Sequence, residues 1–395
     1  MSDGTSTLPK TSLAERLFEP GPKRILALDG GGVRGIISLA FLERIEGLMA
    51  ERTGRAAFRL CDYYDLIGGA STGSIIATGL ALGYSAGELI ELYKTLSRQA
   101  FRGTHWQWLQ GLLGPKFATA PLMEAIEQQV GAETLGSDKL RTGLAIVAKR
   151  LDTGSVWVLH NNPRGKFFGS GDKSPFTPNR DLKLVNLLRA STAAPTYFEP
   201  EFLDVAPDIR GVFIDGGVSP HNNPALLMLM LATISGYGFN WPTGVDKLSL
   251  TSVGTGEYYA PFDSSSWLST TGAGLALGAL RTMLTDNDAL VQTLMQWMSR
   301  CATPWEIDSE IGDLSQDDFS GSAHFHYQRY DLVLDREWLK GNLGLDLPPE
   351  AILRLAQFDQ PQVAQELLEL GRAAAKTKIQ ADHFPAVFDL PPAKL

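Results

Sequence analysis

The sequence contains little cysteine and no long hydrophobic run. Only two of its 395 residues are cysteines, Cys61 and Cys301, which is too few for a disulfide framework or a Cys-based zinc site and indicates a reducing compartment. The longest apolar run, residues 225–232, is far shorter than the roughly 20 residues that span a bilayer. Residues 1–20 are polar, are interrupted by Pro9 and lack the apolar core of a signal peptide. We therefore expect a cytoplasmic protein that is peripheral at a membrane at most.

Dense basic tracts are also missing. The formal net charge is −9 at pH 7, and no segment is crowded with lysine and arginine. Because a surface that binds nucleic acid has to be basic, we expect no nucleic acid as a partner. Hydrophobic residues make up 44% of the chain. A large core can therefore form, either as one large domain or as one domain with additions.

Short apolar runs that end in glycine-rich turns are typical of buried strands. They lie at residues 25–28, 64–67, 143–148, 156–159, 211–214 and 248–253, the third and fourth flanking a turn that predicts a β-hairpin. Residues 36–49 have apolar side chains on one helical face, and residues 85–97 begin with a capping box of Ser85 and Glu88. This alternation predicts the α/β fold class, with a mainly parallel central sheet flanked by helices. The turns predict a site along one rim of the sheet.

The pattern weakens after about Pro261. Helices are expected at about residues 275–284 and 288–300, and residues 349–378 look helical and polar. No internal repeat or long low-complexity linker separates this part from the rest. We expect a flexible N-terminal segment, a principal domain and a helical C-terminal extension packed on the core, at residues 1–22, 23–260 and 261–395.

Ser71 lies at the centre of a G-x-S-x-G pattern between Gly69 and Gly73. A strand-like run precedes this pattern and a helix-like run follows it, which is the setting of a nucleophile elbow. The glycines allow a tight turn and leave space for an approaching ester. The hydroxyl then lies at a helix N-terminus, where free N–H groups favour developing negative charge. A five-residue match can also be an ordinary turn, so the neighbouring motifs matter.

A second glycine-rich loop, residues 30–35, follows the first strand and opens a helix. It also satisfies G-x-G-x-x-G, the dinucleotide fingerprint, but that site needs an acid at the end of the next strand, where this chain has glycines. The alternative is an oxyanion hole formed by the backbone N–H groups of Gly30, Gly31 and Gly32. Arg34 would stabilise the loop, attract an anionic head group or be solvated.

Asp215 ends another strand and is followed by Gly216 and Gly217. A carboxylate there can accept the serine proton directly, provided that burial or close contact raises its pKa from about 3.9. Asp-Gly is also common in ordinary Asx-turns.

A Ser-His-Asp triad is the chemical rival to a direct aspartate base. Four histidines follow Asp215 in the order that α/β-hydrolases use, namely His221, His324, His326 and His383. His221 is expected in a loop near the site. His324 and His326 alternate with aromatic residues, which fits one face of a strand, and without nearby acids or cysteines they make a poor zinc site. We therefore predict no catalytic metal.

Together, these motifs resemble the patatin family of lipid acyl hydrolases, which includes plant patatins, bacterial patatin-like phospholipases and relatives of cytosolic phospholipase A2. Residues 29–35 are similar to its D-G-G-G-x-[KR]-G, residues 69–73 match its G-x-S-x-G, and residues 215–217 match its D-G-[AG]. Weaker similarities lie at residues 189–198, 222–224 and 253–256. The resemblance covers residues 23 to about 260, and residues 261–395 contain no motif that we can assign.

The resemblance implies a patatin-like three-layer sandwich and a catalytic dyad of Ser71 and Asp215. It also implies an oxyanion hole at Gly30, Gly31 and Gly32. We expect no cofactor and no metal. The residues that complete the motifs are Arg34, Gly35, Gly69, Gly73, Gly216 and Gly217. The implied activity is a phospholipase A type of lipid acyl hydrolysis through an acyl-enzyme, with phospholipids or other acyl lipids as substrates.

Other functions remain open. Some bacterial relatives are phospholipase effectors in defence that a cyclic nucleotide switches on, and a general Ser-His-Asp esterase or a storage or regulatory protein would share this pattern. Residues 101–113, with Trp106 and Trp108, suit either a lid that contacts a membrane surface transiently or an ordinary packed helix. The acidic net charge argues against strong electrostatic binding to anionic bilayers. The sequence leaves the oligomeric state undetermined.

Overall fold

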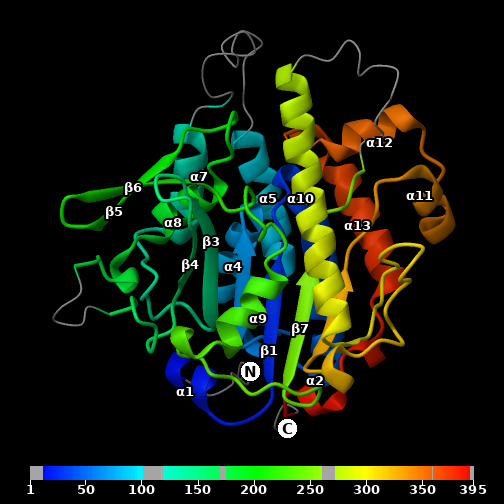
Figure 1. The fold of residues 1–395 in the computed structure, drawn as a ribbon, viewed down its shortest axis with the longest axis horizontal. Coiled ribbons are helices and arrows are strands. Elements are labelled where there is room, and N and C mark those ends of the chain that lie inside the picture. Colours follow the sequence, from blue (N-terminus) through cyan, green and yellow to red (C-terminus); the bar gives the residue numbers. More distant parts are fainter. Residues whose placement is uncertain are drawn as a thin grey trace, which may run out of the picture.

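The computed structural model describes residues 12–100, 117, 119–169, 175–259, 272–357 and 359–391 (Figure 1). The strands are β1 (Lys23–Leu28), β2 (Leu66–Ala70), β3 (Gly143–Arg150), β4 (Val156–His160), β5 (Glu201–Ala206), β6 (Ile209–Asp215), β7 (Leu248–Val253), β8 (Arg300–Cys301) and β9 (His326–Tyr330). The α-helices are α1 (Leu13–Phe18), α2 (Gly35–Thr53), α3 (Leu60–Tyr63), α4 (Thr72–Leu82), α5 (Ala86–Ala100), α7 (Thr119–Val130), α8 (Leu184–Thr192), α9 (Ala225–Thr233), α10 (Gly272–Trp297), α11 (Arg336–Leu343), α12 (Pro349–Ala356) and α13 (Ala364–Lys378).

The strands form one sheet in the order β5-β6-β3-β2-β1-β7-β9-β8, with β4 paired to β3. The pairs from β3 through β2, β1, β7 and β9 to β8 are parallel. The predicted hairpin of β3 and β4 and the pairs that involve β6 are antiparallel. The expectation of a mainly parallel central sheet is confirmed.

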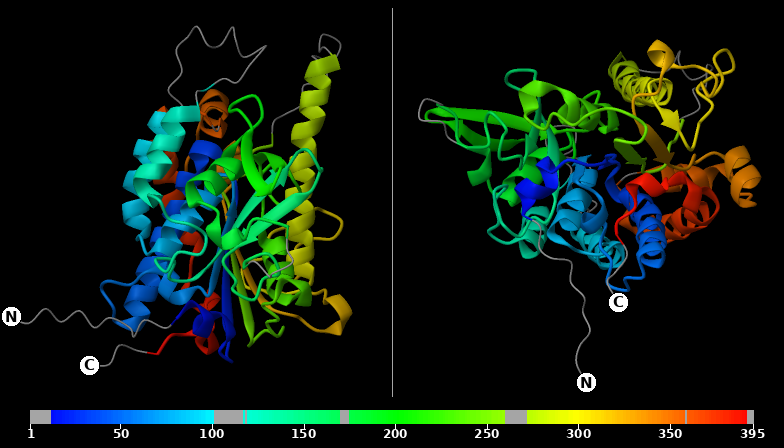
Figure 2. Two further views of the ribbon diagram at one scale, coloured as in Figure 1. Left: turned by 90° about the vertical axis from the view of Figure 1, so that its left-hand side faces the viewer. Right: turned by 90° about the horizontal axis from the view of Figure 1, so that it is seen from below.

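Helices cover both faces of this sheet, which gives three layers (Figure 2). Successive side chains of β1 point to opposite faces. Leu26 and Leu28 join the core formed with α2, α4, α5, α7, α8 and α13, whereas Ile25 and Ala27 join the core formed with α1, α9 and α10. Because both faces are covered, the central strands are apolar on both sides. The predicted α/β class of three-layer sandwich is confirmed.

The ends of the chain depart from the expected division. Residues 12–22 are not a loose segment, because Ser12 and Glu15 form a capping box that starts α1, and Leu17 is fully buried. The sheet also continues past residue 261, since β9 pairs with β7 and α13 packs on α2. The boundary at residue 260 therefore does not coincide with the edge of the sheet.

The two helices expected at residues 275–284 and 288–300 are instead one helix, α10. Asp286 and Asn287 have low helix propensity, but packing of the following turns outweighs it, with Val291 and Met295 buried. The helical stretch expected at 349–378 is divided between α12 and α13, with a 3₁₀ turn before α13.

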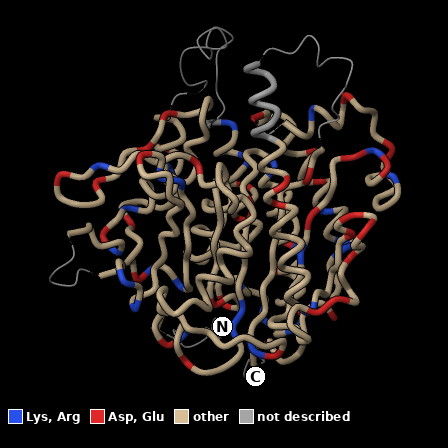
Figure 3. The backbone as a smooth tube through the Cα atoms, viewed as in Figure 1, with Lys and Arg blue, Asp and Glu red and all other residues tan. Residues whose placement is uncertain are grey.

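The surface gives little indication of a partner. Basic and acidic positions are interspersed in the view of Figure 3, without a continuous basic face over the described residues. Among the helices that the structure describes, none combines the length and the apolar character needed to cross a bilayer. The aromatic segment 101–113, proposed above as a lid or a packed helix, lies outside the described residues.

Candidate active site

The site forms where two strands end on the same edge of β3. β4 pairs with Ala145–Lys149 and β6 pairs with Ala148–Arg150, so β4 and β6 must lie on opposite edges of β3. β2 also lies opposite β4, because both pair with residues 145–147. The end of β2 therefore meets the end of β6, with Ala70 opposite Val147 and Asp215 opposite Ala148. This register places Ser71, the next residue after β2, beside Asp215.

Ser71 adopts the strained backbone conformation that is expected of a nucleophile elbow. Its φ is 52° and its ψ is −129°, which is unusual for a residue other than glycine. A side chain on Gly69 would collide with the backbone of Gly73, and one on Gly73 would collide with the carbonyl of Leu28. Both glycines are therefore required by the close approach of β1, β2 and α4.

Two backbone contacts fix the elbow in place. The Ser71 N–H donates to Ser191 Oγ at 3.0 Å, and Ser191 Oγ donates to the Val147 carbonyl at 2.6 Å. On the other side, Ser74 Oγ donates to the Ser71 carbonyl at 2.6 Å. Since Ser71 is hydrogen-bonded to α8 and α4, its hydroxyl has a defined direction.

That direction is toward Asp215. Ser71 Oγ donates to Asp215 Oδ2 at 2.7 Å, and the Gly217 N–H donates to Asp215 Oδ1 at 2.7 Å. The exposed fractions are 9% for Ser71 and 5% for Asp215. Burial raises the pKa of Asp215 to about 6, although the hydrogen bonds from Ser71 and Gly217 and the charge of Arg189 lower it. Asp215 is thus a stronger base than an exposed aspartate, and it contacts the serine proton.

The glycine loop lies against the same serine. A Cβ on Gly30 would be 3.0 Å from Ser71 Cβ and 2.6 Å from Asn222 Oδ1. The Gly30 N–H donates to the Asn222 carbonyl at 3.2 Å, and the Gly31 N–H donates to Thr72 Oγ1 at 3.2 Å. Gly32 has a φ of 58°, and among the described residues its N–H has no hydrogen-bond acceptor. Of the three predicted donors, Gly32 is therefore the one that is free.

The remaining motif residues are packed around this loop. A Cβ on Gly35 would be 2.5 Å from the Tyr93 hydroxyl, one on Gly217 would be 2.8 Å from Asn222 Oδ1, and one on Gly216 would collide with the Val147 carbonyl. Arg34 Nε is buried without a hydrogen-bond acceptor among the described residues. Burial lowers the pKa of Arg34, and the carboxylates of Asp331, Asp288 and Glu257 act in the opposite direction.

A family model described as patatin-like phospholipase matches residues 26–229, just over half of the chain. The chain belongs to the patatin-like phospholipase family. The matched region includes the second half of β1, the glycine loop, the elbow and Asp215, whereas β7, α10 and β9 lie beyond it.

The relatives divide into two groups. A cGAMP-activated phospholipase of Escherichia coli is 36% identical over 52% of this chain and 55% of its own length. A cGAMP-activated phospholipase of Vibrio cholerae is 32% identical over 61% of this chain and 67% of its own length. Potato patatin group A-3 is 27% identical over 78% of this chain and 76% of its own length. The chain therefore spans about half of the length of the E. coli relative. Among solved structures, human GIVD cytosolic phospholipase A2 has a TM-score of 0.39 and 12% identity, covering 93% of this chain and 64% of that chain.

Among the described residues of this patatin-like chain, no histidine is hydrogen-bonded to the serine. The hydrogen bonds of the described residues include none from His221 to Ser71 or Asp215, and His221 Nδ1 is buried without a partner. His324 contacts Ser320, and His383 contacts Tyr330. Ser71 Oγ is bonded to the carboxylate itself. No group of three or more His, Cys, Asp or Glu side chains within the described ranges could bind a metal ion.

A buried ionic cluster adjoins the glycine loop, and the sequence motifs do not predict it. Arg329 Nη2 donates to Asp29 Oδ2 and to Asp331 Oδ2, each at 2.7 Å, and Nη1 donates to Ser252 Oγ at 2.8 Å. Burial raises the pKa of Asp29 to about 8 and that of Asp331 to about 6, while Arg329 lowers both. Asp29 precedes Gly30 directly, so β9 contributes a cation to the patatin-like loop.

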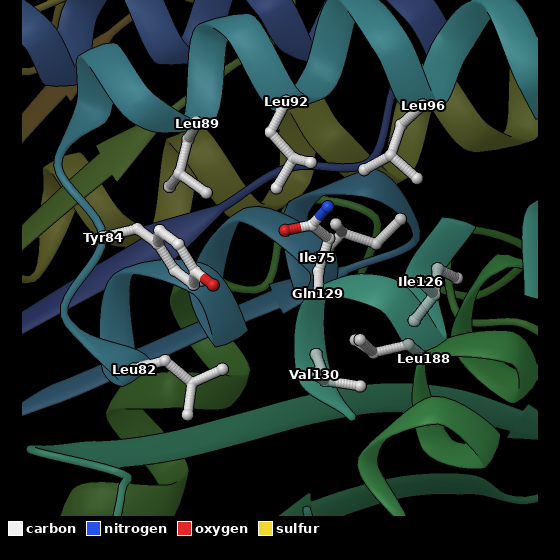
Figure 4. A pocket seen from close by; sticks show the side chains of 11 residues that line it. Ile75, Leu82, Tyr84, Leu89, Leu92, Leu96, Ile126, Gln129, Val130 and Leu188 are labelled. Carbon is white, nitrogen blue, oxygen red and sulfur yellow. The ribbon is translucent and has the colours of Figure 1, made fainter. Parts of the chain in front are cut away.

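An apolar cavity lies between α4, α5, α7 and α8 (Figure 4). Ile75, Gly79 and Leu82 line it from α4, and Leu92 and Leu96 point into it from α5. Ile75 is about one helical turn after Ser71, and Leu82 is about three turns after it. The cavity therefore provides a hydrocarbon-lined space beside the helix that begins at the elbow.

Proposed function

We propose that this chain is a serine lipid acyl hydrolase of the phospholipase A type, with Ser71 as the nucleophile and Asp215 as the general base. The observation that carries the proposal is the 2.7 Å hydrogen bond between the two side chains, both buried at strand ends. Membership of the patatin-like phospholipase family supports the choice of an acyl lipid as the substrate.

The proposed reaction has two halves. Ser71 Oγ attacks the ester carbonyl carbon while its proton passes to Asp215 Oδ2, which is already in contact with it. The tetrahedral intermediate collapses, the leaving alcohol takes the proton from Asp215, and the acyl group stays on Ser71. A water molecule then attacks the acyl-enzyme, gives its proton to Asp215, and releases a fatty acid while Ser71 regains its hydrogen.

The glycine loop is the proposed oxyanion hole. The free N–H of Gly32 is its most available donor, and the N–H of Gly31 can turn from Thr72 toward the developing charge. The absence of Cβ atoms lets a carbonyl approach the backbone closely. Each such donor typically contributes roughly 3 to 4 kcal/mol of transition-state stabilisation.

We expect the purified protein to release free fatty acid and lysophospholipid from vesicles of phosphatidylglycerol and phosphatidylethanolamine. The family membership motivates this choice of substrate. Lipid mass spectrometry identifies both products, and Ser71→Ala is the control for contaminating lipases. Diacylglycerol or phosphatidic acid as the main product would contradict acyl-ester cleavage.

Activation by a cyclic dinucleotide is a second candidate property, since the E. coli and V. cholerae relatives are named cGAMP-activated phospholipases. The same vesicle assay with and without cGAMP tests it. A large increase in fatty-acid release on addition of cGAMP would support an effector, and equal rates would favour a constitutively active hydrolase.

The pH dependence of kcat/KM is expected to follow Asp215. Only the ionised carboxylate accepts the serine proton, and burial raises the pKa of Asp215 to about 6. We therefore expect kcat/KM to fall on acidification, about tenfold per pH unit below pH 6, and to be constant above it. The measurement is the rate on a soluble p-nitrophenyl ester from about pH 4.5 to 8.5. His221→Gln should keep the same midpoint, and disappearance of that midpoint would instead identify the histidine as the base.

A further inference from the structure

The backbone around Gly30 is hydrogen-bonded to parts of the chain that are far away in sequence. Its N–H donates to the Asn222 carbonyl at 3.2 Å, and its carbonyl accepts from Thr255 Oγ1 at 3.1 Å. Its Cα lies beside Ser71, since a Cβ there would be 3.0 Å from Ser71 Cβ. A shift of Asn222 would therefore move the first peptide of the glycine loop relative to the serine.

Asn222 is itself fixed by one carboxylate of α10. Asn222 Nδ2 donates to Asp288 Oδ2 at 3.2 Å, and the Asn223 N–H donates to Asp288 Oδ1 at 3.2 Å. Both oxygens of Asp288 are thus used on two successive residues of the loop between β6 and α9. Such a two-point contact fixes the orientation of the loop as well as its position.

Asp288 lies at the point where α10 leaves the core. The turns after it are packed, with Val291 and Met295 buried and Gln292 accepting from the Tyr327 hydroxyl at 2.8 Å. Before it, Met283 is 59% exposed, and the first turns of α10 rise past the strand ends (Figures 1 and 2). Asp288 therefore connects the packed half of this helix to the rim of the site.

We propose that Asp288 is a positioning residue for the glycine loop, acting through Asn222 on the backbone of Gly30. The inference rests on the proposed function of that loop as the oxyanion hole. It assigns α10, which lies beyond the region matched by the family model, a part in setting the geometry of catalysis. Asp288 does not touch the reacting atoms, so its removal should slow the chemical step and leave the binding of a small ester unchanged.

The test compares Asp288→Ala with Asp286→Ala, an exposed aspartate on the same helix. On a soluble p-nitrophenyl ester, Asp288→Ala should lower kcat by about ten- to a hundredfold, with KM within about twofold of the wild type. Asp286→Ala should match the wild type in both constants. If Asp288→Ala fails to fold, the isosteric Asp288→Asn replaces it, with a smaller fall in kcat expected because its amide oxygen still accepts one hydrogen bond.

A double-mutant cycle shows whether the effect passes through Asn222. Asp288→Ala should slow the Asn222→Ala variant by a smaller factor than it slows the wild type, because the contact between Asn222 Nδ2 and Asp288 is already gone and only the bond from the Asn223 N–H is left to lose. Fully additive losses, or a fall in melting temperature that accounts for the lost activity, would overturn the positioning role. Unchanged kcat in folded Asp288→Ala would do the same.

Amide hydrogen exchange separates this inference from the proposed function. In Asp288→Ala, peptides that contain residues 29–34 and 219–224 should exchange faster than in Asp286→Ala, whatever the chemistry of the site. If Ser71→Ala stays active while this exchange still accelerates, the proposed Ser71–Asp215 dyad is wrong and the structural coupling of Asp288 to the loop stands. If exchange is unchanged and Ser71 is essential, only the role of Asp288 is wrong.

Discussion

Ser71→Ala and Asp215→Ala are each expected to lower kcat on a soluble p-nitrophenyl ester by at least about 10⁴-fold. Without the Ser71 hydroxyl no acyl-enzyme can form, and without the Asp215 carboxylate that hydroxyl has no hydrogen-bond acceptor among the described residues. The double variant should be hardly slower than either single variant, because the two residues act as one unit.

The matched comparison is His221→Gln, which removes the histidine closest in sequence to Asp215. It should lower kcat severalfold at most, since His221 has no hydrogen bond to Ser71 or Asp215 within the described ranges. Melting temperatures and circular dichroism of all variants establish that they are folded. Appreciable turnover by folded Ser71→Ala refutes the dyad, and a loss in His221→Gln as large as that in Ser71→Ala favours the triad.

Arg329→Met should reduce the free energy of unfolding by about 3 to 5 kcal/mol. The substitution leaves the carboxylates of Asp29 and Asp331 buried together without their shared cation. The space around them is tight, because a side chain on Gly254 would collide with Asp331. Urea unfolding at pH 8 measures the loss. A variant as stable as the wild type would show that the two carboxylates are solvated or protonated.

The surface pair of Arg336 and Asp346 provides the control, since both side chains are about half exposed. Arg336→Met should cost about 1 kcal/mol or less. The pH dependence gives a second check. Burial already raises the pKa of Asp29 to about 8 and that of Asp331 to about 6 with Arg329 present, and without the cation both should rise further. Protonation then favours the folded state, so the loss of stability in Arg329→Met should shrink as the pH falls from 8 to 5.

The parts of the fold that local patterns specify could be predicted from the sequence. The run at 248–253 gave the bounds of β7, the capping box of Ser85 and Glu88 starts α5, and the glycines around Ser71 predicted the elbow. These features depend on residues within a few positions of one another. Ser12 and Glu15 also have the capping-box spacing that starts α1, although the polar composition of this segment predicts flexibility.

The parts of the site that depend on distant pairing could not be predicted. Ser191 and Asn222 lie in stretches with weak similarity to the family, but their contacts with Ser71 and Gly30 require the positions of α8 and of the β6–α9 loop. Neither Arg329 nor Asp288 lies in a sequence motif that indicates a function. Their role follows from the parallel pairing of β9 with β7 and from the continuity of α10, neither of which leaves a local pattern.

The place of β9 in the sheet has a consequence for how the protein is made. Asp29 leaves the ribosome 300 residues before its partner Arg329. Contacts of such long range form late, because the intervening chain must be ordered first. During synthesis, the loop beside Ser71 thus lacks the guanidinium that contacts Asp29 until Arg329 has emerged.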